Sequence, residues 1–307
     1  MSSSKEMGFR PPMGLGPHHS FLGLAQSRES YEASRAVVIP APYDGTTTYR
    51  AGTREGPRAI LAASRELEPF DEETGADVWE AGIATIEELP VIVSSPRDMV
   101  TRVREAVGLV IDEGKLPVLL GGEHLLSLGA IEALAERIPA LTVLHLDAHA
   151  DLKAEYQESP FSNACVMHHV SRMASLVQVG IRSLTREERD TIRERSIPCF
   201  WGHELWRDPA LWDGVVERLG PEVYVSIDLD VLDPSIMPAV GTPEPGGLGW
   251  YEVLRLLRRV ARARHVVGFD VMELLPIPHM PAPDFLAARL VYKLLGYILM
   301  DKGLPIW

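Results

Sequence analysis

The sequence predicts an α/β protein in which a mostly parallel central sheet is covered by helices on both faces, as a three-layer α/β/α sandwich. Short apolar runs alternate along the chain with longer segments of helical periodicity. The apolar runs are nearly continuous rather than alternating, which is typical of parallel strands buried on both faces. The 307 residues, of which 46% are hydrophobic, suffice for one large core. Because no repeat or linker interrupts this pattern, we expect a single domain over residues 33–307.

The N-terminal part has three recognisable segments. Residues 1–32 are rich in Ser, Gly and Pro, so we expect a flexible arm. Residues 36–40 form a first short apolar strand, which runs into a polar loop rich in Gly and Thr. A helix over residues 57–64 follows the loop, because Pro57 suits the first helical turn.

The next helix has clear start and stop signals. Ser95 is its expected N-cap, Pro96 occupies the first helical position and Asp98 stands three residues after the cap. Gly114 is the expected end, and a strand over residues 117–120 comes directly after it. The remaining elements continue the alternation, with strands at 141–147, 175–180, 223–228 and 265–270 and helices at 125–137, 185–195, 209–219, 250–263 and 285–300.

Composition narrows the classes of function. The formal charge of −13 disfavours nucleic acid as a partner, because phosphates require a basic surface, and it suits a small cationic substrate. Cys165 and Cys199 form no Cys-x-x-Cys pair, so we expect neither a thiolate zinc site nor a disulfide framework, and a cytoplasmic location. No apolar run approaches the roughly 18 residues of a membrane span, and the N-terminus lacks the pattern of a signal peptide.

Three of the predicted strands end in acidic or imidazole side chains. An isolated Asp-x-His-x-Asp motif is commonly a solvated turn, but here the pattern recurs at strand ends, where open α/β sheets bind ligands. Residues at alternate positions of an extended chain point to one side and can converge. Burying so many carboxylates without cations would be costly, so we expect bound metal. The candidate ligands are His124, Asp147, His149, Asp151, Asp228 and Asp230.

The donor types indicate which metals to expect. No thiolate is among the six candidates, which favours Mn²⁺, with Ni²⁺, Co²⁺, Fe²⁺ or Zn²⁺ as alternatives. Six side chains exceed the needs of one ion, and four carboxylates balance the charge of two divalent ions. Two ions bridged by carboxylates match the two-metal strategy of hydrolytic enzymes.

The motifs around these residues resemble those of the ureohydrolases, the arginase and agmatinase superfamily. The resemblance runs in order from about residue 36 to 300. It rests on Gly-Gly-Glu-His at 121–124, Asp-Ala-His-Ala-Asp at 147–151, Ser-Ile-Asp-Leu-Asp-Val-Leu-Asp-Pro at 226–234, Gly-Thr-Pro-Glu-Pro-Gly-Gly at 241–247 and Asp-Val-Met-Glu at 270–273. Pro-Tyr-Asp at 42–44 and the segments 52–60 and 285–293 are similar to the agmatinase branch in particular.

The resemblance implies an arginase-like fold, a catalytic domain over residues 33–307 and two Mn²⁺ ions. His124, Asp147, Asp151 and Asp228 would hold one ion, and Asp147, His149, Asp228 and Asp230 the other. It also implies a homo-oligomer, a trimer or a hexamer.

Two further positions would serve the reaction and the substrate. Glu273 would bind the guanidinium group, since a planar cation with parallel N–H donors prefers a bidentate carboxylate. Asp151 would also act in catalysis by orienting the attacking water and passing its proton to the leaving amine. Thr242 would either hydrogen-bond near the guanidinium or serve only as a turn residue between Gly241 and Pro243.

The sequence departs from the family pattern at one position of the site. Asn163 stands where members usually carry a histidine that contacts the substrate or transfers a proton. Asparagine can hydrogen-bond but cannot transfer a proton. His168 and His169 lie close in sequence and could substitute, although histidines on a helix surface are the alternative interpretation. A smaller change is Glu123, where aspartate is common.

The implied reaction is hydrolysis of the guanidinium of agmatine, or of a relative such as N1-aminopropylagmatine, to urea and putrescine or spermidine in polyamine biosynthesis. Asn163 leaves room and a neutral acceptor for a longer polyamine chain, so we expect aminopropylagmatine to be preferred over agmatine. Guanidinobutyrate and arginine are alternative substrates, and a metal-bound pseudoenzyme acting as a binding protein is an alternative class. A metallophosphoesterase is disfavoured, because no Gly-Asp-x-x-Asp segment lies between residues 124 and 147.

Overall fold

The computed structural model describes residues 19–301, and the sheet at the centre of this part of the chain has eight strands. Their order is β4-β1-β5-β10-β9-β6-β7-β8, and every pairing is parallel. The strands are β1 (Ala36–Ala41), β4 (Ile83–Thr85), β5 (Leu116–Gly121), β6 (Leu141–Leu146), β7 (Ser175–Ile181), β8 (Cys199–Trp201), β9 (Glu222–Asp228) and β10 (His265–Met272). A separate antiparallel pair joins β2 (Phe70–Asp71) to β3 (Ala76–Asp77).

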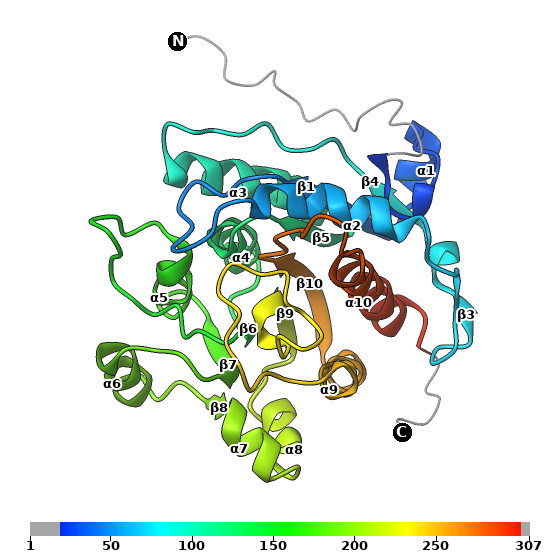
Figure 1. Cartoon of the computed structure of the whole chain (residues 1–307). Helices are drawn as coiled ribbons and strands as arrows, with labels where there is room; N and C mark the ends of the chain where they lie inside the picture. The colour runs from blue at the N-terminus through cyan, green and yellow to red at the C-terminus, as the bar shows by residue number, and fades with distance from the viewer. Residues whose placement is uncertain (1–18, 302–307) are drawn as a thin grey trace.

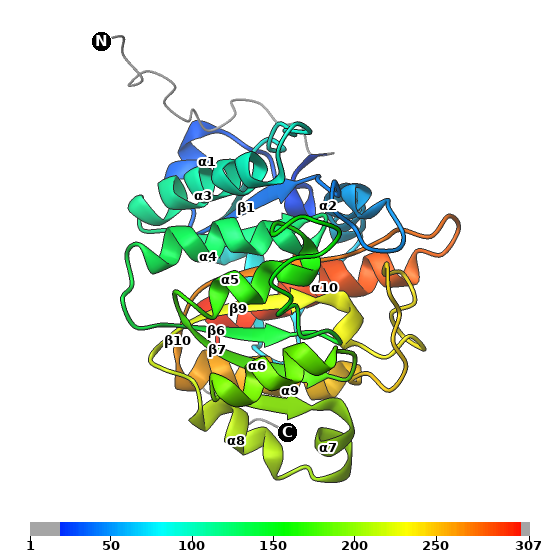
Figure 2. The same ribbon diagram turned by 90° about the vertical axis from the view of Figure 1, so that its left-hand side faces the viewer.

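Helices cover both faces of the sheet, which confirms the predicted three-layer sandwich (Figures 1 and 2). On one face, α3 (Pro96–Asp112), α4 (Ser127–Ala135), α5 (Val166–Val170) and α6 (Arg186–Glu194) share one apolar cluster with the strands. On the other face, α2 (Gly56–Ser64), α8 (Leu211–Glu217), α9 (Trp250–Ala263) and α10 (Ala282–Leu299) share a second cluster. The shorter helices α1 (Arg28–Ala33) and α7 (Gly202–Arg207) lie toward the edges of the molecule.

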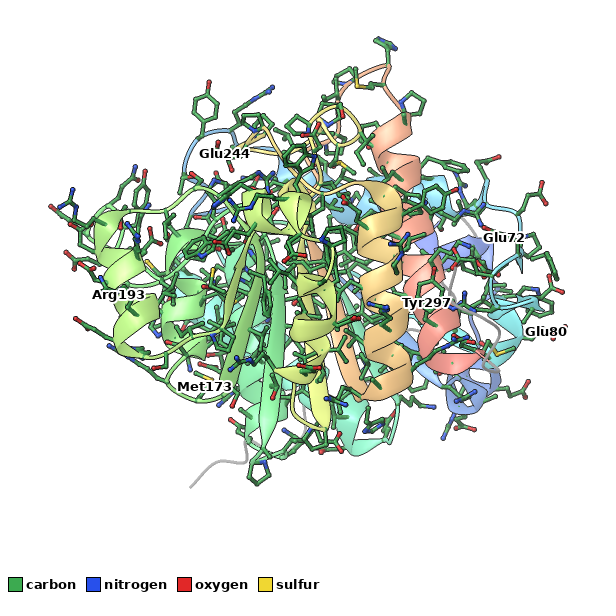
Figure 3. All side chains as sticks on the ribbon, turned by 90° about the horizontal axis from the view of Figure 1, so that it is seen from below. Glu72, Glu80, Met173, Arg193, Glu244 and Tyr297 are labelled. Atoms are coloured by element: carbon green, nitrogen blue, oxygen red, sulfur yellow. The ribbon has the colours of Figure 1, made fainter. Side chains whose placement is uncertain are left out.

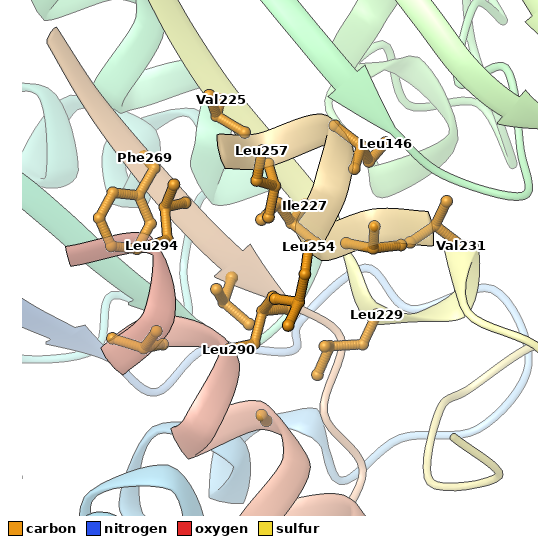
Figure 4. Close-up of a cluster of buried hydrophobic side chains, with 14 of the residues drawn as sticks. Leu146, Val225, Ile227, Leu229, Val231, Leu254, Leu257, Phe269, Leu290 and Leu294 are labelled. Atoms are coloured by element: carbon orange, nitrogen blue, oxygen red, sulfur yellow. The ribbon is translucent and has the colours of Figure 1, made fainter. Parts of the chain in front are cut away.

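The strands are buried on both faces because successive side chains point to opposite layers. In β9, Val225 and Ile227 pack with Leu254 and Leu257 of α9 (Figure 4), whereas the side chain of Ser226 points to the opposite layer. A fully buried leucine of this kind stabilises the fold by about 1.5–3 kcal/mol. The continuous apolar runs therefore indicated burial correctly, and the polar Ser226 within the β9 run contacts the functional site.

The chain order places the functional groups at the middle of the sheet. From β5 the chain crosses to β6 and then builds outward to β7 and β8, and the gap is later filled by β9 and β10. The four central neighbours are thus β5, β10, β9 and β6. In open α/β sheets, ligands bind beyond the carboxyl ends of strands where the winding direction changes. All nine site residues predicted from the sequence lie on these strand ends or on the loops that follow them.

The predicted caps are confirmed at two helices. The hydroxyl of Ser95 accepts the N–H of Asp98 at the start of α3, and Thr185 forms a reciprocal capping box with Glu188 at the start of α6. The prediction omitted β2, β3, β4, β8, α1, α5 and α7, each of six residues or fewer. Such short elements form because neighbouring strands and helices hold them, so their own sequences show little periodicity.

The start of the described region is packed against the domain. Phe21 is fully buried, and α1 begins at Arg28 with Ser27 as its N-cap. Residues 1–18, which are most of the predicted arm, lie outside the described residues, so the division of the chain at residue 32 stays a prediction. Among the described residues, the structure has no helix with the length and apolar character that a membrane crossing requires.

Candidate metal centre

Six side chains from three strand ends form two adjoining groups. The first group surrounds the Nδ1 atom of His124, which stands three residues after the end of β5. Carboxylate oxygens of Asp147, Asp151 and Asp228 lie 3.0, 3.3 and 3.4 Å from this nitrogen. These four residues are the set expected to share one ion.

The second group surrounds the Nδ1 atom of His149. Asp230 Oδ2 lies 2.9 Å from this nitrogen and Asp147 Oδ1 lies 3.5 Å away. Asp147 therefore contributes one oxygen to each group, as expected of a bridging ligand. The side chain of Asp228 accepts the N–H of Asp230 at 2.8 Å, which holds these two acids next to each other.

The arrangement around His124 fits a cation. Its Nε2 lies 2.9 Å from the hydroxyl of Ser226, and this hydroxyl donates its own hydrogen to Asp270. Ser226 therefore accepts the N–H of Nε2, so Nδ1 is the ring nitrogen that faces the three buried carboxylates. Although burial lowers the pKa of His124, hydrogen bonds to these carboxylates raise it well above its usual value, so the ring carries a second proton on Nδ1. A metal ion between the four groups would take the place of that proton.

The protonation of the acids leads to the same conclusion. Burial and the neighbouring charges of Asp230 and Asp147 raise the pKa of Asp228 well above its usual value. Burial and Asp147 likewise raise the pKa of Asp151. Carboxyl groups that repel one another in this way hold extra protons until a cation replaces them. Carboxylate and imidazole donors of this kind suit divalent metals from Mn²⁺ to Zn²⁺.

A cavity of 340 Å³ opens onto both groups. Its lining includes Asp151, Asp228, His149 and Glu273, and the further lining residues Lys153, Tyr156 and Glu188 are together called the outer wall. Asp151 and Glu273 adopt positive φ angles of 51° and 66°. Such backbone strain is uncommon for residues other than glycine and is often found at functional sites.

Glu273 lies beside the first group without belonging to it. It follows β10, its carboxylate accepts the backbone N–H of His124 at 2.7 Å, and it is 7% exposed. Burial raises its pKa to about 8, and the nearby Glu123 contributes to this rise. A buried carboxylate that would gain from a cationic partner, and that faces the cavity, suits the binding of a guanidinium.

The loop that follows β9 places Thr242 next to Asp230 of the second group. Arg182 donates hydrogen bonds to the backbone carbonyls of Asp230 and Glu244 at 2.6 and 2.8 Å, which ties this loop to the end of β9. Figure 3 shows Glu244 at one end of the strands, with Met173, directly before β7, at the other. The hydroxyl of Thr242 donates to Asp230 at 3.4 Å and lines the cavity. Thr242 therefore contacts a predicted metal ligand as well as forming part of the turn, and its role in substrate binding stays a prediction.

Asn163 lines the cavity, but it presents a different atom from the one expected. Its side-chain oxygen accepts the N–H of Ala164 at 2.9 Å, so the amide NH₂ is the group available to the cavity. The neutral acceptor that we expected for a polyamine chain is therefore engaged elsewhere. His169 stacks on Phe161 and its Nε2 contacts the carbonyl of Pro160, while His168, also in α5, is buried. Neither histidine lines the cavity.

His145 is a buried member of the site that the sequence analysis missed. It stands two residues before Asp147, and its Nε2 lies 2.8 Å from Asp147 Oδ2. With His124, Asp147 and Asp151 it forms a group whose donor atoms are close enough to hold an ion. Its place inside an apolar strand hid it, although period-two spacing from Asp147 puts both side chains on one face.

Comparison with known proteins identifies the family. Residues 34–296 match the sequence profile of the arginase family. The chain belongs to the arginase family. A relative from Thermus thermophilus is 42% identical over 92% of this chain and 96% of its own, and one from Synechocystis is 39% identical over 87% and 90%. Both relatives are named N(1)-aminopropylagmatine ureohydrolase.

A solved structure of the arginase family agrees with the architecture. The agmatine ureohydrolase of Thermoplasma volcanium superposes with a TM-score of 0.81, with 31% identity over 87% of this chain and 91% of its own. The predicted resemblance, the arginase-like fold and the class of metal-dependent ureohydrolase are confirmed. The two donor groups fit the binuclear centre on which this family depends. The roles assigned to individual site residues stay predictions.

The buried carboxyl group of Glu123, next to His124, should make the stability of the protein depend on pH. Burial raises its pKa from 4.5 to about 7, although hydrogen bonds from Thr46 oppose the rise. Since folding favours the protonated form, its contribution to stability is present below about pH 4.5 and is lost as the pH rises to 7. The loss amounts to at most about 3 kcal/mol. In urea unfolding of the metal-free protein, the free energy of unfolding of Glu123→Gln should therefore rise relative to that of wild type as the pH increases from about 4.5 to 7. A pH-independent difference between the two proteins would contradict this assignment.

Proposed function

We propose that this chain hydrolyses the guanidinium of a guanidino-amine to urea and a polyamine, with N1-aminopropylagmatine as its best substrate and agmatine as the second. The observation that carries the proposal is the cavity itself. Its lining includes both Asp151 and Glu273, whose carboxylate is hydrogen-bonded to the backbone N–H of His124 and so lies next to the first group of metal donors. The arginase-family relatives that carry the name aminopropylagmatine ureohydrolase support the longer substrate.

The residues of the cavity divide the reaction between them. Two bound ions would lower the pKa of a water molecule held at the site and so supply the nucleophile near neutral pH. Glu273 binds two parallel N–H groups of the guanidinium and holds its carbon toward the donor groups. Asp151 accepts the proton of the attacking water and returns it to the leaving amine nitrogen. Asn163 donates a hydrogen bond from its NH₂ but transfers no proton.

One residue of the outer wall, Glu188, favours a substrate with a cationic tail. Glu188 is 4% exposed, and its two oxygens accept backbone N–H groups of Leu152 and Thr185. Its negative charge at the cavity would attract an ammonium group. Lys153 is the opposing observation, since its ammonium lies 4.8 Å from the centre of the Tyr156 ring in the same wall. Lys153 favours a carboxylate-tailed substrate such as guanidinobutyrate, which is therefore the alternative to the two amine substrates.

The wider setting follows from the same proposal. We propose Mn²⁺ as the native metal, with Ni²⁺, Co²⁺, Fe²⁺ and Zn²⁺ as alternatives, because carboxylates outnumber imidazoles in both groups. Putrescine or spermidine would be the product, and we propose a role in polyamine biosynthesis in the cytoplasm. A homo-oligomer, either a trimer or a hexamer, stays the prediction for the assembly.

Urea release from Mn²⁺-loaded protein tests the substrate. We expect kcat/KM for aminopropylagmatine to exceed that for agmatine by about tenfold, with guanidinobutyrate and arginine lower still. Asn163→His should narrow the gap between the first two substrates, because it restores a proton-transfer group worth about 10²–10⁴-fold in other enzymes. A wild-type preference for agmatine that Asn163→His leaves unchanged would make Asn163 a passive loop residue. Absence of urea from all four compounds would favour the binding-protein alternative.

A further inference from the structure

A chain of three hydrogen-bonded side chains leads from β7 to the bridging carboxylate. Gln178 of β7 pairs in register with His145 of β6, so their side chains lie side by side on one face of the sheet. Gln178 Nε2 lies 3.0 Å from His145 Nδ1, and His145 Nε2 lies 2.8 Å from Asp147 Oδ2. All three residues are fully buried.

Gln178 fixes the tautomer of His145. Its amide nitrogen also donates to the carbonyl of Ala150 at 2.8 Å. The amide cannot turn over, because its oxygen would then face that carbonyl. Gln178 therefore presents an N–H to Nδ1 of His145, which must accept it. The ring proton is left on Nε2, where it points at Asp147.

This tautomer excludes His145 as a metal ligand. For Nε2 to coordinate an ion, the ring proton would have to move to Nδ1, where it would meet the N–H of Gln178. We propose that His145 is a positioning residue, locked by Gln178, whose N–H fixes the rotation of Asp147. The position of His145 among metal-donor atoms then reflects its contact with Asp147 rather than coordination.

The rotation of the Asp147 carboxylate determines which of its two oxygens faces the group around His124 and which faces the group around His149. Oδ2, the oxygen that takes the N–H of His145, lies 3.0 Å from Nδ1 of His124. Oδ1 accepts the backbone N–H of His149 at 2.5 Å and faces its ring. Each oxygen is thus held from outside the metal groups, by the side chain of His145 on one side and by the backbone on the other. Loss of the His145 contact should lower the affinity for both metal ions, because Asp147 belongs to both groups.

Metal affinity of the protein without substrate tests this inference. His145→Leu removes the donor, and we expect about 10–100-fold weaker Mn²⁺ binding by calorimetry, with both ions affected. His145→Gln can place an amide N–H near the position of Nε2 and should recover most of the affinity. Gln178→Met, of similar volume, should give an intermediate loss and a mixed His145 tautomer in ¹⁵N NMR of the metal-free protein. His265→Leu, which replaces an exposed histidine at the start of β10, is the matched control.

The outcomes separate positioning from packing and from coordination. Equal weakening in His145→Leu and His145→Gln would assign the effect to packing alone and overturn the proposal. Unchanged affinity in His145→Leu would overturn it as well. A ¹⁵N signal showing Nε2 deprotonated and bound to the added metal would make His145 a ligand. These measurements use the protein without substrate, so they would test the role of His145 even if the proposed function were wrong.

Discussion

Replacing Asp228 with alanine is expected to lower the rate of urea release by about 10³-fold or more and to leave less than one bound Mn²⁺ per chain. Asp228 supplies a carboxylate oxygen 3.4 Å from Nδ1 of His124, and its other oxygen holds the backbone of Asp230. Its removal therefore affects both donor groups. The metal-loaded protein should also lose thermal stability, because the free energy of ion binding no longer favours the folded state.

Two companion variants make this result specific. Asp228→Asn keeps the shape and the hydrogen bond to Asp230 but removes the charge, so it should fold as well as wild type and still bind metal poorly. Asp190→Ala removes an exposed acid of α6 and should change neither metal content nor rate. Elemental analysis after dialysis measures the stoichiometry. Two ions retained in Asp228→Ala would refute the bridging role.

The metal groups were predictable because the signal is local. Asp147, His149 and Asp151 lie at alternate positions directly after an apolar strand, so their proximity follows from the spacing alone. That His124 and Asp228 would meet them depends on the order of the strands. It followed from the general rule that carboxyl ends of parallel strands share one edge, with the family resemblance as support.

Other parts of the site could not be predicted from local patterns. His145 lies within an apolar run, and Gln178, the residue that fixes its tautomer, belongs to a different strand. The outer wall joins Tyr156 of the loop after β6 to Glu188 of α6, a pairing that only the packed structure establishes. For Asn163, we expected the amide oxygen to face the cavity, although the sequence itself allows either amide atom to do so. The backbone N–H of Ala164 decides between them, and this contact depends on the local turn.

Glu273→Gln should separate substrate binding from metal binding. The glutamine keeps the length, the backbone strain and an oxygen that can accept the N–H of His124, but it has no negative charge. A buried cation that loses its charged partner costs about 3 kcal/mol or more, which corresponds to roughly 10²-fold or more in kcat/KM.

The loss should be specific to guanidinium recognition, because Glu273 lies outside both donor groups. We expect Glu273→Gln to retain two Mn²⁺ per chain by elemental analysis, in contrast to Asp228→Ala. We also expect it to lose affinity for an unreactive guanidinium compound in calorimetry, so that the defect is seen without turnover. Full affinity for that compound, or a loss of metal equal to that of Asp228→Ala, would show that Glu273 supports the metal groups instead of the substrate. The two variants together therefore decide whether charge at the end of β9 and charge at the end of β10 perform separate tasks.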